Sequence, residues 1–367
     1  MSEWKETKLQ EIAVINPAER LAKGTKAKKV AMELLQPFTK KISTYTKEEY
    51  KGGVKFRNGD TLVARITPSL ENGKTSFVDL LEDDEVGFGS TEFIVLREIK
   101  GISDKNYLFY LACSPEFRDL AIASMTGSSG RQRVQTDVVK QHEFLFPPLP
   151  EQRAIASVLS SLDDKIDLLH RQNKTLEAMA ETLFRQWFVE EADEGWEEGM
   201  LGDVIELIYG KGLKKEIRTD TGCPVIGSSG VVGYHSEFLV EGPGIVIGRK
   251  GTLGKVIYLW DNFFPIDTTY YIKSKVESAG LLYEYFLLKT LNFEEMNSDS
   301  AVPGLNRDIA LSTEIKIAPL GKLNKFNQFT STFINKLRDN IKQIRTLEKL
   351  RDTLLPKLMS REVRMSY

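Results

Sequence analysis

The sequence predicts an α+β protein built as a tandem repeat, with two globular domains that are each followed by a long helix. A similar segment ends each half of the 367-residue chain, and each copy leads into a long stretch of heptad-spaced apolar residues. Short alternating strands and glycine-rich turns occur in both globular parts. We expect globular domains at 1–150 and 191–320, a helix within 151–190, and a helix and tail within 321–367.

The repeat is clearest where each globular half ends. Residues 137–149 read DVVKQHEFLFPPL and residues 308–320 read DIALSTEIKIAPL, so both alternate apolar residues before a Pro-Leu pair. Upstream, Trp4 and Trp196 each open a half. In addition, 59–65 resembles 242–249, since both read as a turn followed by a strand.

Strands are expected at 91–96 and 268–272, and helices at 107–120 and 281–291.

The segments that follow the two globular parts are predicted to form helices that pair as an antiparallel coiled coil. Their apolar positions alternate in steps of four and three, and each series has one central asparagine, Asn173 or Asn340. Antiparallel pairing places the two asparagines opposite each other, whereas parallel pairing sets Asn173 against Ile344 and leaves a polar group unsatisfied. The alternative is that each helix packs on its own domain with its asparagine in water. The two series are Ile155, Leu159, Leu162, Ile166, Leu169, Asn173, Leu176, Ala180, Leu183 and Trp187, and Phe326, Thr330, Phe333, Leu337, Asn340, Ile344, Leu347, Arg351, Leu354 and Leu358.

Composition places few limits on function. The net charge of −2 and the pI near 6.1 do not favour a DNA-binding protein. However, residues 190–198 hold six acids and no base, so a local basic surface is permitted elsewhere. Cys113 and Cys223 are far apart and have no CxxC partner, which suits a reducing compartment. The polar opening and the absence of a long apolar run predict a cytoplasmic protein without a membrane span.

Four segments resemble the conserved regions of Type I restriction–modification specificity subunits. They are PPLPEQRAIA at 147–156, LDDKI at 162–166, GRKGTLGKV at 248–256 and LEKLRDTLLPKL at 347–358. The second repeat departs from the pattern, because 319–322 read PLGK in place of Pro-Leu-Pro-Glu.

The resemblance implies that each globular part is a target-recognition domain for one half of a split double-stranded DNA site. It also implies that the helices form a spacer and dock two modification subunits. Those subunits would bind S-adenosylmethionine and methylate adenine, and restriction subunits that use ATP and Mg²⁺ would join them. The chain itself would hold no cofactor or metal and would not be an enzyme.

Clusters of basic and small polar residues are the candidate DNA contacts. Arginine can read guanine and glutamine can read adenine through paired hydrogen bonds, while serine and glycine suit phosphate. In isolation each such residue is more often solvated surface than a DNA contact, so the clusters and the resemblance carry the prediction. In the first half the candidates are Arg65, Lys74, Ser128, Ser129, Arg131, Gln132 and Arg133, and in the second half Lys211, Lys214, Lys215, Ser228, Ser229, Arg249, Lys250, Thr252, Asn306 and Arg307.

Catalytic constellations are not found in the sequence. Gly73-Lys74-Thr75 resembles the end of a phosphate-binding loop, but Pro68 stands where that loop needs a glycine. No Pro-Asp dipeptide accompanies Glu98 or Glu314 as a metal-dependent nuclease would require, and the three histidines lack ligand spacing. Two alternatives stay open: a self-contained enzyme that cleaves or modifies DNA, and a coiled-coil adaptor that binds only protein.

Overall fold

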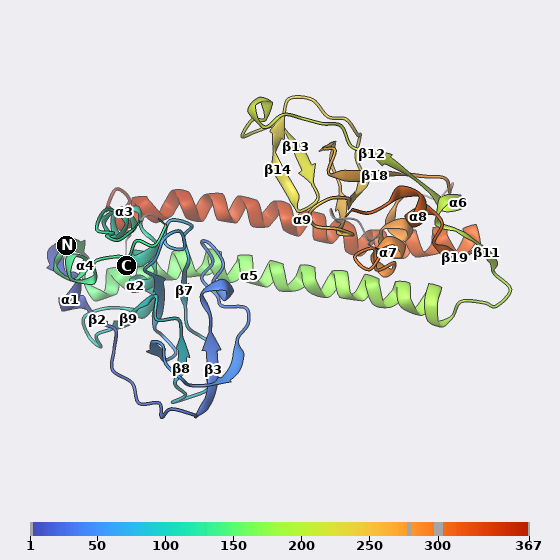
Figure 1. Cartoon of the computed structure of the whole chain (residues 1–367). Helices are drawn as coiled ribbons and strands as arrows, with labels where there is room; N and C mark the ends of the chain where they lie inside the picture. Colours follow the sequence, from blue (N-terminus) through green and yellow to red (C-terminus); the bar gives the residue numbers. More distant parts are fainter. Residues whose placement is uncertain (1–2, 129, 277–279, 297–303, 366–367) are drawn as a thin grey trace. The chain divides into compact units, whose positions relative to one another are not determined.

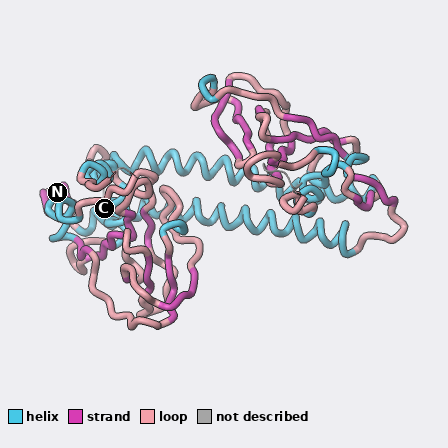
Figure 2. Tube along the Cα trace, viewed as in Figure 1, coloured by secondary structure: helices cyan, strands magenta, loops and turns pink. Residues whose placement is uncertain are grey.

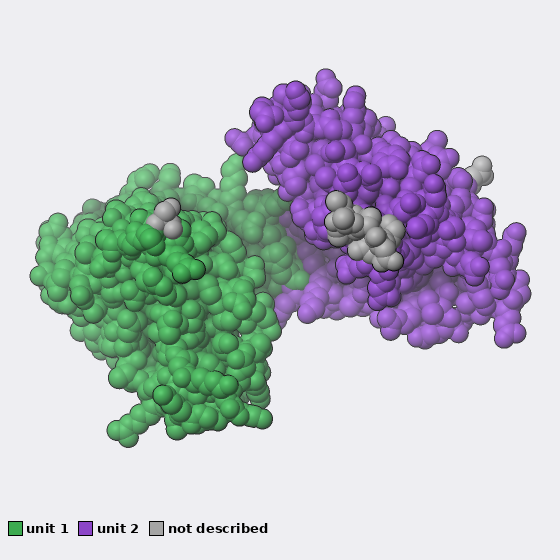
Figure 3. Space-filling model, viewed as in Figure 1, with its two compact units in different colours: residues 1–170, 343–367 green, residues 171–342 purple. Residues whose placement is uncertain are grey.

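The computed structural model describes residues 3–128, 130–276, 280–296 and 304–365. It forms two compact units (Figure 3): unit 1 comprises residues 1–170 and 343–367, and unit 2 comprises residues 171–342. The division falls inside the two long helices, α5 (Leu149–Arg185) and α9 (Leu320–Met359). Domain boundaries near 150, 190 and 320 therefore stay a prediction. No described helix is both long and apolar enough to cross a membrane.

Unit 1 contains two four-stranded sheets and a two-stranded ribbon (Figure 1). The first sheet has the order β2-β9-β6-β7 and is antiparallel throughout. The second has the order β4-β3-β8-β5, with β3 and β8 parallel. The ribbon pairs β1 with β10. The elements before α5 are β1 (Lys5–Lys8), α1 (Leu9–Ile12), β2 (Ala13–Ile15), β3 (Lys26–Val30), β4 (Thr46–Glu49), β5 (Lys55–Phe56), β6 (Thr61–Ala64), β7 (Thr75–Phe77), β8 (Gly87–Gly89), β9 (Phe93–Glu98), α2 (Lys105–Cys113), α3 (Pro115–Ala123), α4 (Thr136–Gln141) and β10 (Glu143–Phe146).

Unit 2 repeats this topology, except that its second sheet has three strands in place of four. Its main sheet has the order β12-β18-β15-β16, a second sheet has the order β14-β13-β17, and β11 pairs with β19. Figure 2 shows that each globular part consists mostly of strands and loops with short helices. The elements are β11 (Glu197–Met200), α6 (Leu201–Val204), β12 (Ile205–Tyr209), β13 (Cys223–Gly227), β14 (Gly230–His235), β15 (Gly244–Gly248), β16 (Val256–Leu259), β17 (Phe264–Pro265), β18 (Thr269–Ser274), α7 (Leu282–Thr290), α8 (Arg307–Leu311) and β19 (Glu314–Ile317). The predicted α+β tandem repeat with long helices is confirmed.

The helix expected at 107–120 is in fact two helices. Asp104 caps α2 by accepting hydrogen bonds from the backbone N–H groups of Asn106 and Tyr107. Ser114 then caps α3 by accepting from the N–H of Phe117, and Pro115 occupies the first turn. A proline removes a donor that the helix interior needs but the first turn does not, so the Ser-Pro pair starts a new helix.

Each unit packs its globular part against segments of both long helices. In unit 1 the core that contains Tyr107 also includes Ile155 of α5 and Leu358 of α9. In unit 2, Phe184 of α5 and Phe326 of α9 lie in one core with residues of α7. Burial of these side chains anchors each domain to the helices, since each fully buried side chain contributes about 1.5–3 kcal/mol.

Within each unit the α5 and α9 segments run antiparallel. In unit 2, Asn173 lies near the α9 residue Asn340, while Trp187, in the π-helical turn that directly follows α5, contacts Phe326, which comes earlier in α9. In unit 1, Ile166 and Leu169 form a cluster with Ile344, and Leu347 packs against it. The Nδ2 group of Asn340 donates to Oδ1 of Asn173 at 2.9 Å, so the two central asparagines are opposite each other as the heptads predict.

Candidate nucleic-acid interface

An arginine follows β6, an inner strand of the first sheet of unit 1, and lies at a junction of three segments. Arg65 directly follows β6, and its backbone N–H donates to the carbonyl oxygen of Glu92 at 2.9 Å. The carbonyl oxygen of Arg65 accepts from the N–H of Val134 at 2.9 Å, and Ile66 bridges to Arg133. Strand β6, the start of β9 and the loop before α4 therefore meet at Arg65.

Unit 2 builds the same junction around Arg249, which directly follows β15. Its N–H donates to the carbonyl oxygen of Thr268 at 2.9 Å, and its carbonyl oxygen accepts from the N–H of Leu305 at 3.0 Å. Lys250 forms an isolated backbone β-bridge with Gly304, just as Ile66 does with Arg133. The faint resemblance of 59–65 to 242–249 thus reflects equivalent positions in the two folds.

The 126–133 loop of unit 1 is a short hairpin that ends at the junction. Thr126 and Arg133 exchange backbone hydrogen bonds of 3.1 and 2.9 Å, and Thr67 N–H donates to the carbonyl oxygen of Gln132 at 3.0 Å. Gly127 has a φ of +132°, and a Cβ there would lie 3.0 Å from the backbone oxygen of Arg131. The tight turn therefore favours glycine at this position. Ser128 and Arg131 are exposed at the tip, and Ser129 lies outside the described residues.

The two arginines of the unit 1 junction have different surroundings. Arg133 is exposed, and its Nε and Nη2 groups donate to the carboxylate of Glu92 over 2.7–3.0 Å. The hydrogen bonds from Arg133 hold the pKa of Glu92 below its usual value. Arg65 is half-buried, with Nη2 3.5 Å from the carbonyl oxygen of Val134, and its Nε has no hydrogen-bond partner among the residues that the structure describes. The structure thus brings Arg65, Gln132 and Arg133 together, and it adds Glu92, which the sequence did not indicate.

An aromatic ring joins the two arginines of the unit 2 junction. The guanidinium carbon of Arg249 lies 4.9 Å from the ring centroid of Tyr209, and that of Arg307 lies 5.7 Å from it. Tyr209 is about half-exposed and also packs edge-on against Tyr270. Burial raises the pKa of Tyr270 to about 12, so its hydroxyl stays protonated and donates to the carbonyl oxygen of Leu305 at 3.0 Å.

This arginine–tyrosine cluster combines two positive charges with a partly exposed aromatic ring. A guanidinium that stacks on a ring keeps its planar edge for phosphate or guanine. Arg249 uses Nη1 to donate to the carbonyl oxygen of Asp267 at 3.0 Å, which fixes the side chain. A hollow of about 260 Å³ lies beside Tyr209 and Arg307. The sequence did not indicate Tyr209, because nothing in the order of residues brings the end of β12 and the end of β15 to the same edge of the sheet, on either side of β18.

The remaining unit 2 candidates form one smaller group and several isolated positions. Ser228 lies against the glycine-rich turn, since a Cβ at Gly248 would approach both Ser228 and the backbone of Thr252. The carbonyl oxygen of Ser229 accepts from the Lys255 ammonium at 2.7 Å. Lys211, Lys214 and Lys215 are exposed between β12 and β13.

Two candidates are engaged within their own units. The ammonium of Lys74 donates to the carbonyl oxygen of Met32 at 3.0 Å. The side-chain oxygen of Asn306 caps α8 by accepting from the N–H groups of Asp308 and Ile309 at 2.9 and 3.2 Å. Both side chains therefore have local roles that explain their presence.

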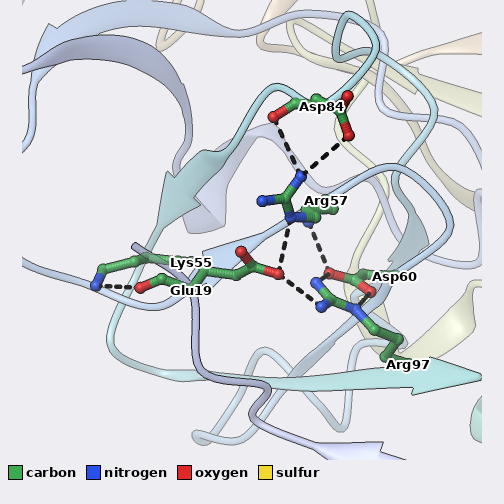
Figure 4. Close-up of polar contacts among 6 residues, drawn as sticks. All are labelled: Glu19, Lys55, Arg57, Asp60, Asp84 and Arg97. Atoms are coloured by element: carbon green, nitrogen blue, oxygen red, sulfur yellow. Dashed lines mark hydrogen bonds and ion pairs between the residues drawn. The ribbon is translucent and has the colours of Figure 1, made fainter. Parts of the chain in front are cut away.

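A second set of unit 1 arginines is neutralised by carboxylates (Figure 4). Arg97 binds both oxygens of the fully buried Asp60 at 2.6 and 2.7 Å, and its Nη1 lies 2.6 Å from Glu19. Arg57 Nε lies 2.9 Å from the same Glu19 oxygen. Asp60 precedes β6 whereas Arg65 follows it, so this network lies at the other end of the strand from the junction. We assign it to stability of the domain.

The sequence matches the model of the family described as Type I restriction modification DNA specificity domain twice, over residues 1–178 and 193–349. The chain therefore belongs to the family of Type I restriction–modification DNA specificity proteins and carries the domain in two copies.

Individual relatives support the assignment. The chain is 34% identical over 158 residues to the EcoAI specificity subunit of Escherichia coli, which is 41% of this chain and 27% of that protein. It is 27% identical over 301 residues to the MjaIX specificity subunit of Methanocaldococcus jannaschii, which is 71% of this chain and 69% of that protein. The first alignment thus spans about a quarter of the relative.

A crystal structure of the Type I restriction–modification S subunit from M. genitalium has the same fold. It aligns with a TM-score of 0.62 at 22% identity, over 97% of this chain and 96% of that one.

Proposed function

We propose that this chain is the DNA-reading subunit of a Type I restriction–modification complex and that each globular domain reads one half of a split target. The observation that carries the proposal is the repeated junction, where Arg65 and Arg249 occupy equivalent backbone positions in two copies of a DNA specificity domain. Arginine is well suited to contact guanine edges and phosphates. To test it, we would co-express the chain with candidate modification subunits and map methylated adenines across the genome. A two-part motif is expected, and no chain-dependent methylation would contradict the proposal.

We further propose that α5 and α9 form an antiparallel coiled coil along their length. The support is the pairing inside each unit: Asn173 with Asn340 in unit 2, and Leu169 with Ile344 in unit 1. From Leu169 to Asn173 the chain moves four residues forward on α5, and the partner moves four residues back on α9, from Ile344 to Asn340. That relation is expected when one heptad register continues along both helices.

We propose that an apolar groove in unit 2 contributes to docking a modification subunit. The groove has a volume of about 630 Å³, and Met179 of α5 and Phe329 of α9 are exposed in it to 45% and 58%. Such apolar exposure between polar helix faces is typical of a protein interface. The lining residues are Lys174, Thr175, Ala178, Met179, Thr182, Leu183, Phe329 and Phe333.

A charged residue in the groove tests this docking proposal. Phe329→Asp should abolish co-purification with the modification subunit, because a charge cannot be buried there without a partner. Phe238→Asp is the matched control, since Phe238 is exposed to 52% in the same unit outside the groove. Equal co-purification of both variants would contradict a role for the groove.

We also propose that the chain contributes no catalytic group or cofactor. Among the described residues, no group of three or more histidine, cysteine, aspartate or glutamate side chains could hold a metal ion. S-adenosylmethionine would bind the modification subunits, and ATP and Mg²⁺ would bind the restriction subunits. Nuclease, ATPase or methyltransferase activity in the pure chain, lost on a point substitution within it, would contradict this proposal.

A further inference from the structure

Glu92 lies between the two arginines of the unit 1 junction. Both of its carboxylate oxygens accept hydrogen bonds from Arg133, and its backbone carbonyl oxygen accepts from the N–H of Arg65. Its own N–H donates to the Ser90 hydroxyl at 3.1 Å. The Glu92 side chain is 23% exposed and that of Arg133 is 45% exposed, so the ion pair reaches the surface of the candidate interface.

The carboxylate is not needed to build the junction. In unit 2 the equivalent backbone position is Thr268, whose carbonyl oxygen accepts from Arg249 at 2.9 Å as that of Glu92 accepts from Arg65. Among the described residues, the Arg249 side chain contacts the backbone carbonyl of Asp267 and the rings of Tyr209 and Tyr270. The same fold is therefore made with a carboxylate in one domain and without one in the other.

A carboxylate beside an arginine affects charged and neutral ligands differently. The hydrogen bonds to Glu92 use Nε and Nη2 of Arg133. They do not use the other edge of the guanidinium group, which includes Nη1. A guanine edge accepts two hydrogen bonds from such an edge and carries no net charge. A phosphate that binds Arg133 carries a full negative charge and is repelled by the neighbouring Glu92 carboxylate.

We propose that Glu92 is a specificity-determining residue, which orients Arg133 toward neutral base edges and weakens its contact with backbone phosphates. The proposal rests on the DNA-reading function proposed above. With Glu92 in place, the N-terminal domain binds DNA of arbitrary sequence more weakly than the same domain would without this carboxylate. Non-specific binding comes almost entirely from phosphate contacts, so it is the quantity that Glu92 reduces.

The test measures how the full-length chain binds a random-sequence duplex of about 30 base pairs at several NaCl concentrations. Glu92→Gln keeps an amide oxygen for Arg133 but removes the charge. We expect it to bind about twofold to fivefold more tightly at low salt. The plot of log affinity against log salt should steepen by up to about 0.9 for one added phosphate contact.

Two further variants separate this role from alternatives. Glu48→Gln is the matched control, because it also removes a carboxylate from an exposed ion pair, with Lys29 at 2.9 Å, and raises the net charge equally. It should leave the salt slope unchanged. In an Arg133→Ala background, Glu92→Gln should no longer change the slope, because Glu92 acts through Arg133.

The inference is overturned if Glu92→Gln binds the random duplex with unchanged or weaker affinity and slope while the wild-type chain binds normally. If Glu92 only stabilised the fold, the Glu92→Gln variant would give that result and would also have a lower melting temperature than the wild type. If the wild-type chain binds no duplex at any salt concentration, the proposed function is contradicted and this inference falls with it.

Discussion

Arg65 and Arg249 show, at the scale of single residues, what the order of amino acids can and cannot indicate. Arg249 was predicted to contact DNA because it stands with a lysine beside glycines, and Arg65 was predicted as its counterpart in the first half; the fold places the two at equivalent junctions. The partners of these arginines were not predictable. Glu92 is 41 positions from Arg133 and reaches it only because β9 pairs with β6 and carries it to the junction.

Glu19 gives a prediction for pH dependence at the same scale. Burial alone would raise the pKa of Glu19, but hydrogen bonds from Arg97 and Arg57 outweigh it and bring the pKa below its ordinary 4.5. A lowered folded-state pKa means that the carboxylate stabilises the fold above the unfolded-state pKa, and that this contribution is lost as pH falls through the folded-state pKa. We expect Glu19→Gln to reduce the free energy of unfolding by about 1–3 kcal/mol at pH 7.

Urea unfolding of both proteins at a series of pH values measures this contribution. The difference between wild type and Glu19→Gln should be constant at neutral pH, shrink as pH drops below 4.5 and approach zero in stronger acid. A difference that persists unchanged at the lowest pH would show that Glu19 stabilises the domain by packing alone.

At the scale of elements, the asparagine pair on α5 and α9 makes the sharpest prediction. Asn340 is buried, and its Nδ2 donates to Asn173 at 2.9 Å and reaches Gln172 at 3.4 Å. Asn173→Leu removes the closer acceptor and should lower the free energy of unfolding by about 1–3 kcal/mol, because a buried donor loses its best partner. Replacing both asparagines by leucine should be better tolerated, since no polar group is then left alone.

Thermal unfolding of the single and double variants tests the pair. A double variant that is less stable than Asn173→Leu would contradict it.

The elements themselves were predictable to the extent that their signals are local. Heptad spacing predicted α5 and α9, and the structure starts them at Leu149 and Leu320. The departure at 319–322 did not prevent the second helix. Sequence patterns could not give the sheet order, in which β2 pairs with β9 and β6 lies on the other side of β9, because those hydrogen bonds join distant segments.

At the scale of the whole molecule, the proposed coiled coil sets the gap between half-sites. A helix rises about 1.5 Å per residue and duplex DNA about 3.4 Å per base pair. Removing one heptad from α5 and one from α9 together should therefore shorten the non-specific gap by roughly three base pairs. Methylation maps of strains that carry the paired deletion would give the new gap, and a gap of unchanged length would exclude the helices as a spacer.

The most direct test of the account is to change one domain and read both half-sites. In cells that express the modification subunits, methylated adenines would be mapped for a chain with Arg131 and Gln132 replaced by alanine, and for one with Arg249 and Lys250 replaced. Hydrogen bonds to base edges contribute about 1–3 kcal/mol of discrimination, so each change should be visible in the motif. The account predicts that each variant relaxes one half of a two-part motif and leaves the other half intact. A continuous motif, or the same change in both halves from either variant, would contradict it.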